Sequence, residues 1–198
     1  MSALLPIIHQ NALVEPGVQV GPGTRIWAFA HLLPGAKVGA DCNICGHTFV
    51  EGGVILGDRV TVKCGVFLWS GLAAENDVFI GPVVAFSNDL RPRSRQHPAT
   101  YAPVFLREVC SVGANATILP VSIGRWAMIG AGAVVTKDVP DFALVMGNPG
   151  RIRGWVCRCA RKLDFVDPSK SAKCECGRSF RRVSESSIEE LLVQTDDY

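Results

Sequence analysis

Four cysteines near the C-terminus have a spacing that suits a metal ion. Cys157 and Cys159 form one Cys-x-Cys pair, and Cys174 and Cys176 form a second pair after an interval of 14 residues. Gly177 follows directly, where a tight turn often closes such a knuckle. Two such pairs can supply four thiolates to one tetrahedral Zn²⁺, and four cysteine ligands leave no open position for catalysis. The spacing predicts a structural zinc site, with free or partly oxidised thiols as the alternative.

Arginines gather between residues 87 and 110. This segment holds four arginines, three prolines and one histidine, His97. Because a forked guanidinium matches phosphate oxygens, Arg91, Arg93 and Arg95 are candidate contacts to a phosphorylated substrate. A surface loop without a function is the alternative for this segment.

The C-terminal tail is strongly basic. Residues 151–183 contain ten lysines and arginines against three acidic residues, a surplus of seven positive charges. This surplus suits a polyanionic ligand, and a solvated surface is the alternative. Further along, Ser186 and Ser187 precede two glutamates and an apolar run, in the pattern of a capping box. The tail is therefore expected to end in a short helix.

The elements that position these residues follow from a six-residue repeat. Stepping by six from Ile8 to Phe86 gives 14 positions, and 13 of them carry a large apolar residue. The period returns from Val112 to Val135, with one step of five residues near Pro120. A period of six fits neither the helical period of 3.6 nor the strand period of 2. It predicts short strands joined by sharp bends, three of which close a triangular coil with the apolar side chains inside.

The repeat divides the chain into two parts. Residues 1–152 are expected to form an all-β parallel β-helix of about six coils, interrupted by an excursion loop over residues 87–110. Residues 153–198 form a small cysteine-rich appendage that carries the expected zinc site and helix.

The composition excludes several classes of function. The chain of 198 residues has a net charge of only +2 and 8% aromatic residues, which argues against a nucleic-acid binder. No apolar run approaches the roughly 18 residues of a membrane span. The first ten residues lack the basic region of a signal peptide, so the eight cysteines are expected to be reduced, in a cytoplasmic protein.

The residues within the repeat resemble those of the hexapeptide acyltransferases, whose coil is a left-handed parallel β-helix, over about residues 8–152. The closer resemblance is to the nucleotide-sugar N-acetyltransferases that acetylate the 3-amino group of dTDP- or UDP-linked aminodeoxy sugars. The resembling segments are Arg25–Trp27, Asn43–His47, Val60–Gly65, Phe86–Asp89, Pro92–Ser94, Val112–Pro120, Gly130–Pro140 and Gly147–Pro149. The Asn-Asp and Pro-Arg segments are the most specific of these.

This resemblance implies an enzyme that moves acetyl from acetyl-CoA to the 3-amino group of a nucleotide-linked amino-deoxy sugar, for bacterial surface polysaccharides of the O-antigen or S-layer type. It also implies a homotrimer with active sites between subunits, in which the excursion closes over the nucleotide sugar. The chain departs from the family pattern at Gly46 and Ser70, where relatives carry an acidic residue, and at Ser87, where threonine is usual. These departures leave the exact sugar open.

Acetyl transfer to an amine requires an oriented amine, donors for the developing oxyanion and a proton for the leaving thiolate. Asn88 is the first candidate to orient the amine, and Ser70 lies 18 residues earlier, directly beneath it in the expected coil. Asp89 could accept a proton, or pair with an arginine of its own loop. His47 is the best candidate base, because imidazole titrates near neutral pH, and it is expected two coils below Asn88. His31 is a weaker candidate that could contact the substrate; without an essential base, the CoA sulfur takes the proton.

The last coils are expected to hold acetyl-CoA. Small residues at Ala114 and Ala131, stacked in adjacent coils, would let backbone amides approach the pantetheine. Lys137, Arg151 and Arg153 are candidate phosphate contacts, for which a structural capping role is the alternative. Asn148 is a further candidate contact to the cofactor.

Three other functions remain open on the sequence. An O-acetyltransferase acting on a sugar or serine hydroxyl would need a true general base, so sensitivity to His47→Ala would separate it from an N-acetyltransferase. A γ-carbonic-anhydrase-like metal enzyme would need three converging histidines, and the four histidines here show no paired spacing. A non-catalytic scaffold would use the cysteine-rich tail to bind a partner.

Overall fold

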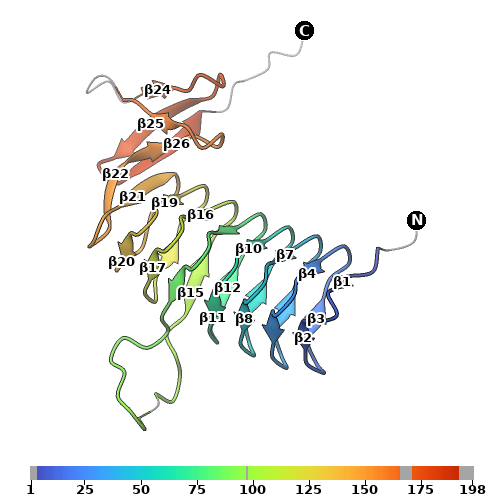
Figure 1. Cartoon of the computed structure of the whole chain (residues 1–198). Coiled ribbons are helices and arrows are strands. Elements are labelled where there is room, and N and C mark those ends of the chain that lie inside the picture. Colours follow the sequence, from blue (N-terminus) through green and yellow to red (C-terminus); the bar gives the residue numbers. More distant parts are fainter. Residues whose placement is uncertain (1–3, 97, 166–170, 192–198) are drawn as a thin grey trace.

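The computed structural model describes residues 4–96, 98–165 and 171–191. Within these ranges every regular element is a β-strand. Three parallel sheets, here named A, B and C, form the sides of a long prism that ends in a small antiparallel tail (Figure 1). None of the described residues forms a helix that is long and apolar enough to cross a membrane.

Each sheet of the prism is a stack of short strands. Sheet A contains β1 (Ile7–Ile8), β4 (Arg25–Ile26), β7 (Asn43–Ile44), β10 (Thr61–Val62), β13 (Phe79–Ile80), β16 (Ser111–Val112), β19 (Met128–Ile129) and β21 (Ala143–Met146). Sheet B contains β2 (Leu13–Val14), β5 (His31–Leu32), β8 (Phe49–Val50), β11 (Phe67–Leu68), β14 (Ala85–Phe86), β17 (Thr117–Ile118) and β20 (Val134–Val135). Sheet C contains β3 (Gln19–Val20), β6 (Lys37–Val38), β9 (Ile55–Leu56), β12 (Leu72–Ala74), β15 (Val104–Leu106) and β18 (Ser122–Ile123).

The register confirms a coil of three hexapeptides. Ile8 pairs with Ile26, and Ile26 pairs with Ile44, so that equivalent residues recur at intervals of 18. Beyond the excursion, Val112 pairs with Ile129, an interval of 17 that reflects the one shortened step of the repeat. Parallel stacking of this kind hides the apolar repeat positions from water, which is the main source of stability.

The prism contains six complete coils, from β1 to β18, as expected. The third side of a seventh coil is a single bridge between Ile123 and Val139, and β21 begins an eighth turn. Every apolar repeat position from Ile26 to Val135 is buried in the continuous core. The architecture is the predicted all-β parallel β-helix, and it is consistent with a left-handed coil.

The corner between sheets A and B has a left-handed backbone. His47, Gly65 and Val83 occupy equivalent places in three successive coils, with φ angles of 58°, 72° and 57°. Left-handed φ is costly for a β-branched residue such as Val83, so the geometry of the coil, and not local preference, determines this corner. The corner in turn determines where the His47 side chain lies.

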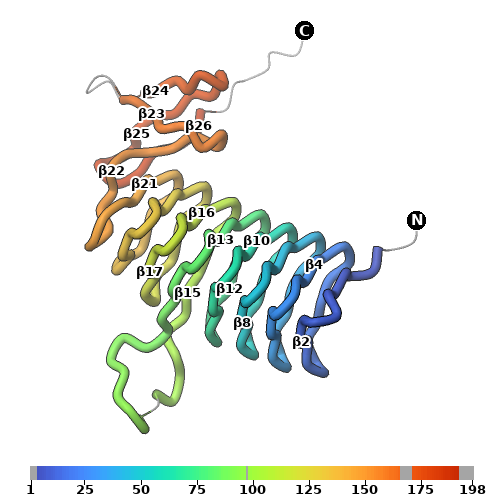
Figure 2. Tube along the Cα trace, in the orientation of Figure 1, coloured from blue at the N-terminus to red at the C-terminus, as the bar shows by residue number. Residues whose placement is uncertain are grey.

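The excursion is shorter than the sequence predicted. The chain leaves the prism after β14 and rejoins it at β15, which pairs with β12 and β18, so the loop covers residues 87–103 and not 87–110. Val104 and Leu106 are buried and restore the apolar alternation of a strand, and Cys110 lies in the core. The loop projects away from the column of coils (Figures 1 and 2).

The tail consists of antiparallel strands at the end of the prism. Its strands are β22 (Arg151–Val156), β23 (Lys162–Leu163), β24 (Ser171–Lys173), β25 (Ser179–Ser184) and β26 (Ser187–Leu191). β22 pairs with β21 of sheet A and with β23, and β25 pairs with both β24 and β26. Phe180 of β25 is fully buried and packs edge-on against Phe142, which anchors this sheet to the last turn of the prism.

The predicted C-terminal helix is wrong over residues 187–191, which form β26. Ile188 is buried, and the neighbouring Glu189 forms an ion pair with Arg181 of β25. Pairing with β25 satisfies the backbone hydrogen-bonding groups of these residues, and a local capping pattern does not reveal this distant partner. The remainder of the predicted helix, from residue 192 onward, lies outside the described residues.

Candidate active site

Asn88 lies at the corner where the chain leaves sheet B, directly above Ser70. The Asn88 Nδ2 atom donates to the Ser70 carbonyl oxygen at 3.2 Å, which confirms the stacking predicted from the 18-residue interval. Trp69 Nε1 donates to the Phe86 carbonyl at 2.9 Å and closes the same corner. These bonds hold the Asn88 side chain in place, and its Oδ1 atom can accept a hydrogen bond from a substrate amine.

Glu51 belongs to this corner, although sequence reasoning missed it. Its Oε2 atom accepts a hydrogen bond from the Ser70 amide at 2.6 Å. A carboxylate therefore lies beside Ser70 and the Asn88 corner. The signal that could have found Glu51 is its place 18 residues before Trp69, at the same corner one coil below.

Asp89 is engaged within its own loop. Its Oδ1 atom accepts a hydrogen bond from the Arg91 amide at 2.8 Å, and Ser87 Oγ donates to the Asp89 carbonyl at 3.0 Å. These contacts form a local turn of the kind that asparagine and aspartate favour. Arg91, Arg93 and Arg95 are exposed on the excursion, and His97 lies outside the described residues. Asp89 is thus held within the excursion, next to Asn88 in the chain, and the arginines follow it on the same loop.

His47 and Asn88 lie at different corners of the prism. It occupies the corner between sheets A and B, where its ring stacks on Phe29 at 5.0 Å, whereas Asn88 occupies the corner between sheets B and C. The expectation that His47 lies two coils directly below Asn88 is therefore wrong. The residue stacked two coils above His47 is Val83, which occupies the same corner as His47. The full width of sheet B separates the two side chains within one chain.

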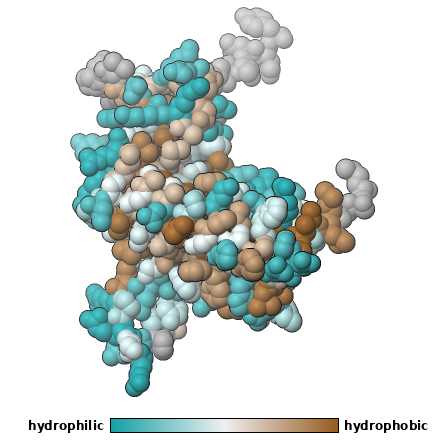
Figure 3. Space-filling view, viewed as in Figure 1, coloured by the Kyte–Doolittle hydropathy of each residue, from teal (hydrophilic) through white to brown (hydrophobic). Residues whose placement is uncertain are grey.

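The outer face of sheet B carries His31 and an aromatic ladder. His31 Nε2 lies 2.6 Å from Glu15 Oε1, and its ring meets the edge of Phe49 at 5.5 Å. Phe49 in turn contacts Phe67 at 6.3 Å and Trp69 at 5.7 Å. Apolar side chains are seen on the prism surface, while the excursion and much of the tail are hydrophilic (Figure 3). The ladder leads from His31 to the Asn88 corner.

Cys110 and Cys45, both in the prism, are poor nucleophiles. Burial raises the pKa of Cys110 to about 12. Burial, together with the neighbouring Cys64, also raises the pKa of Cys45, which lies close to His47 in sequence. Both groups therefore remain protonated thiols near neutral pH.

The predicted cofactor residues fall into two groups. Lys137 and Arg151 line one cavity of about 350 Å³ at the end of the prism, a size that suits a ligand group. The turn before Arg151 continues sheet B, because Gly150 N donates to Val134 O at 2.7 Å. Asn148 is exposed in that turn, and Arg153 is exposed on β22, outside the lining of this cavity.

Ala114 and Ala131 form the second group, on the corner between sheets A and B. The coils approach closely here: a Cβ atom on Gly113 would lie 2.6 Å from the Ala131 amide nitrogen. Their stacking in adjacent coils is as predicted, since Gly113 lies directly before Ala114. Sheet B separates this pair from Lys137 and Arg151, so one chain offers small residues on one corner and cations on the other.

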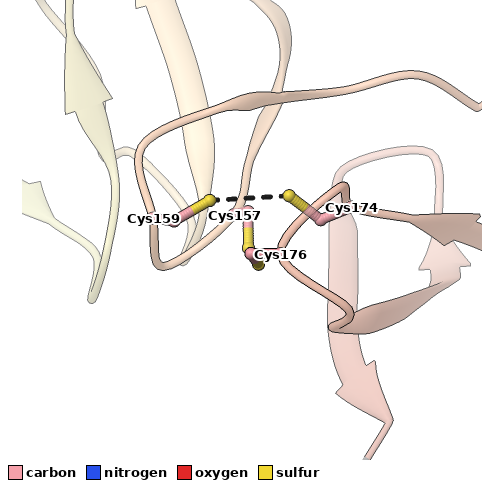
Figure 4. A group of neighbouring side chains, drawn as sticks. All are labelled: Cys157, Cys159, Cys174 and Cys176. Carbon is pink, nitrogen blue, oxygen red and sulfur yellow. Dashed lines mark hydrogen bonds between the residues drawn. The ribbon is translucent and has the colours of Figure 1, made fainter.

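The four cysteines of the tail are brought together (Figure 4). Their Sγ atoms all lie within 4.8 Å of one another, with Cys157 3.4 Å from Cys176 and Cys159 3.5 Å from Cys174. The predicted grouping of these side chains is therefore confirmed, at a site separate from the Asn88 corner.

Comparison with known proteins relates the chain to sugar acetyltransferases. The family "Bacterial transferase hexapeptide (six repeats)" matches residues 17–52, and "Hexapeptide repeat of succinyl-transferase" matches residues 108–137. The dTDP-3-amino-3,6-dideoxy-alpha-D-galactopyranose 3-N-acetyltransferase of Aneurinibacillus thermoaerophilus is 45% identical over 187 residues, which cover 94% of this chain and 95% of that protein. The galactoside O-acetyltransferase of Lactococcus lactis is 30% identical over 83% of this chain and 77% of its own length.

A solved structure with a similar repeat is PerB from Caulobacter crescentus, in complex with CoA and GDP-perosamine. It is 25% identical to this chain, with a TM-score of 0.43. The match covers 77% of this chain and 58% of PerB.

Proposed function

The chain belongs to the hexapeptide-repeat family of nucleotide-sugar 3-N-acetyltransferases, and from this premise we propose that it moves acetyl from acetyl-CoA to the 3-amino group of a nucleotide-linked amino-deoxy sugar. The near full-length relative acts on a dTDP-sugar, which favours dTDP over UDP as the nucleotide. The observation that carries the proposal is the Asn88 corner, a rigid carboxamide beside an arginine-bearing loop on this prism. We propose that the acetylated sugar is used in the biosynthesis of a bacterial surface polysaccharide.

The reaction requires little of the protein beyond orientation. The lone pair of the amine attacks the thioester carbon, a tetrahedral oxyanion forms, and its collapse breaks the carbon–sulfur bond. Asn88 Oδ1 accepts a hydrogen bond from the amine and so aims its lone pair. The proton lost by nitrogen goes to the departing CoA thiolate, so a strong base is not essential.

We further propose a homotrimer whose active sites lie between subunits. Within one chain, His47 and Asn88 lie on opposite corners of sheet B, so a second chain packed against this face could bring its own His47 towards Asn88. Phe67 supports this arrangement, because half of its surface is exposed in the aromatic ladder of sheet B.

The two parts of the chain then have different roles. Residues 1–152 form the catalytic prism, with the arginines of the excursion facing the nucleotide diphosphate. Residues 153–198 form an accessory tail. All eight cysteines are free thiols, which supports a cytoplasmic reaction.

The direct test is thiol release from acetyl-CoA with a panel of dTDP- and UDP-linked 3-amino sugars, together with their 3-hydroxy analogues. Acetylation of at least one amine, with a stronger response to dTDP-sugars, is expected. His47→Ala should lower this activity much less than it would lower a hydroxyl acetylation, which depends on a base. Release only with hydroxyl acceptors would favour the O-acetyltransferase, and release with no acceptor by folded protein would favour a scaffold.

Removal of either cationic side chain from the cavity at the end of the prism is expected to weaken acetyl-CoA binding. Lys137→Ala and Arg151→Ala should each raise the KM for acetyl-CoA by about tenfold, the loss of roughly one charge-assisted hydrogen bond to phosphate. The KM for the amino sugar should stay nearly constant. Arg25→Ala, on an exposed arginine near the other end of the prism, is the matched control. An unchanged KM for acetyl-CoA in both variants would place the cofactor elsewhere.

A further inference from the structure

Two turns of the tail have the same backbone although their sequences differ. We name them knuckle 1 (Cys157–Arg161) and knuckle 2 (Cys174–Arg178). In each, the amide of the first cysteine donates to the carbonyl of the arginine four residues later, at 2.8 Å in both cases. In each, the amide of the fourth residue donates back to the first cysteine carbonyl, at 2.8 and 2.9 Å.

The fourth residue of each knuckle adopts left-handed φ, 68° at Ala160 and 93° at Gly177. Glycine accepts this conformation freely, but alanine does so only at a cost. The same left-handed turn thus occurs twice, around two Cys-x-Cys pairs that are joined by a long connection. Such a repeat indicates a common requirement, which is to direct two thiols from each turn to one point.

The geometry of the four sulfurs suits a tetrahedral ion. All four Sγ atoms lie within 4.8 Å of one another. Sulfurs bound tetrahedrally at about 2.3 Å from Zn²⁺ are themselves about 3.8 Å apart. Two Sγ–Sγ distances between the knuckles, 3.4 and 3.5 Å, bring one cysteine of each turn against one of the other around a shared centre (Figure 4).

The charges around the cluster also suit a metal thiolate. Zn²⁺ with four thiolates carries a net negative charge, and cations nearby stabilise it. Arg178 Nη1 lies 3.5 Å from Cys176 Sγ. Glu190 of β26 then ties the knuckles together, with Arg158 Nε at 2.6 Å and Arg178 Nε at 3.3 Å. Arg158 also stacks over Trp126 of the prism, 4.8 Å from the ring centre.

The cluster joins two sheets whose strands are not hydrogen-bonded to each other. Knuckle 1 follows β22, which is hydrogen-bonded to the last strand of sheet A, whereas knuckle 2 joins β24 to β25. Among the described residues, the sheet β24–β26 buries only Ala172, Phe180 and Ile188, and knuckle 2 adds Cys174. A sheet of this size rarely stays folded on such a core without a disulfide or a metal.

We propose that Cys157, Cys159, Cys174 and Cys176 bind one structural zinc ion, which fastens the sheet β24–β26 to the end of the prism. Folding of this sheet is then coupled to metal binding. The proposal does not depend on the identity of the acetyl acceptor. Strand β22 begins at Arg151, which lines the cavity at the end of the prism, and ends directly before Cys157. The zinc therefore also holds one wall of that cavity in place.

Metal analysis of the full-length protein, purified without chelator, tests the proposal. About one zinc per chain is expected in the wild type, and less than about 0.1 in the double variant Cys159→Ser/Cys176→Ser. Cys64→Ser, which removes an exposed cysteine outside the cluster, should keep the full zinc content. Replacement of the zinc by Co²⁺ should give the thiolate charge-transfer and visible bands of a tetrahedral sulfur site. Folded wild-type protein with four metal-free thiols, or with two disulfides, would overturn the proposal.

Hydrogen exchange on the wild type keeps the proposal testable if the double variant fails to fold. A chelator should remove the protection of residues 171–191 and leave the coils β4–β18 protected, because stability in a solenoid is local. Zinc readdition should restore the protection. Release of the metal without any change in exchange would show that the ion does not fasten this sheet. Neither result depends on acetyl transfer, so failure of the proposed function would be seen separately.

Discussion

Replacement of Asn88 by alanine is expected to lower kcat/KM for the amino sugar by about 10²–10³-fold, the range for loss of one positioned polar group. The Nδ2 atom of Asn88 is held by the Ser70 carbonyl at 3.2 Å, so the carboxamide is already oriented before substrate arrives. Alanine removes the acceptor that aims the amine, while the prism keeps its core. Steady-state kinetics at saturating acetyl-CoA, with thermal melting of the same samples, measure the effect.

Two further variants separate orientation from general disturbance of the corner. Asn88→Asp keeps an acceptor oxygen but loses the donor to Ser70, so it should retain more activity than Asn88→Ala. Asn11→Ala, at an exposed corner of the first coil, should leave the kinetics unchanged. Equal activity of Asn88→Ala and wild type would remove Asn88 from the catalytic site, although the chain could still be an acetyltransferase.

A negative charge in the aromatic ladder of sheet B is expected to dissociate the proposed trimer. Phe67 is 50% exposed in the isolated chain and contacts both Phe49 and Trp69. Burial of a phenylalanine contributes about 1.5–3 kcal/mol, and an unpaired carboxylate in its place adds a desolvation cost in each of three interfaces. Phe67→Asp should therefore be monomeric by light scattering at micromolar concentration. Its activity should fall at least about tenfold, since each site would lose its partner.

Ile55→Asp is the matched control for this prediction. Ile55 is 49% exposed and faces outward on sheet C, so it tests an equal change on a different face of the prism. The trimer and its activity should survive this substitution. Dissociation by Ile55→Asp but not by Phe67→Asp would place the subunit interface on sheet C.

The positions of the core and of Ser70 beneath Asn88 could be predicted from the sequence. A fixed step of 18 residues places one residue above another in a solenoid, so stacking follows from counting. The same arithmetic predicted the shortened coil near Pro120, which the register of Val112 with Ile129 confirms. The four cysteines could likewise be grouped from spacing alone, because two short pairs on neighbouring turns converge readily.

The corners were harder to assign, because small offsets within a coil move a side chain to another side of the prism. His47 and Asn88 differ by 41 residues, five more than two coils, and those five residues span the width of sheet B. The 18-residue interval from Glu51 to Trp69 places Glu51 at this corner, but only the structure shows that its carboxylate turns towards the Ser70 amide.

The amino-acid sequence by itself determined the repeat and the buried column, because a six-residue apolar pattern is buried when three short strands close each coil. The motifs within the repeat determined the family. Only the tertiary structure decided that residues 187–191 form a strand and that the excursion ends before Val104. Both outcomes depend on hydrogen bonds to strands far away in the chain, β25 for the first and β12 for the second. Local signals such as a capping pattern cannot report such partners, since the pairing energy exists only after the coils and the tail have come together.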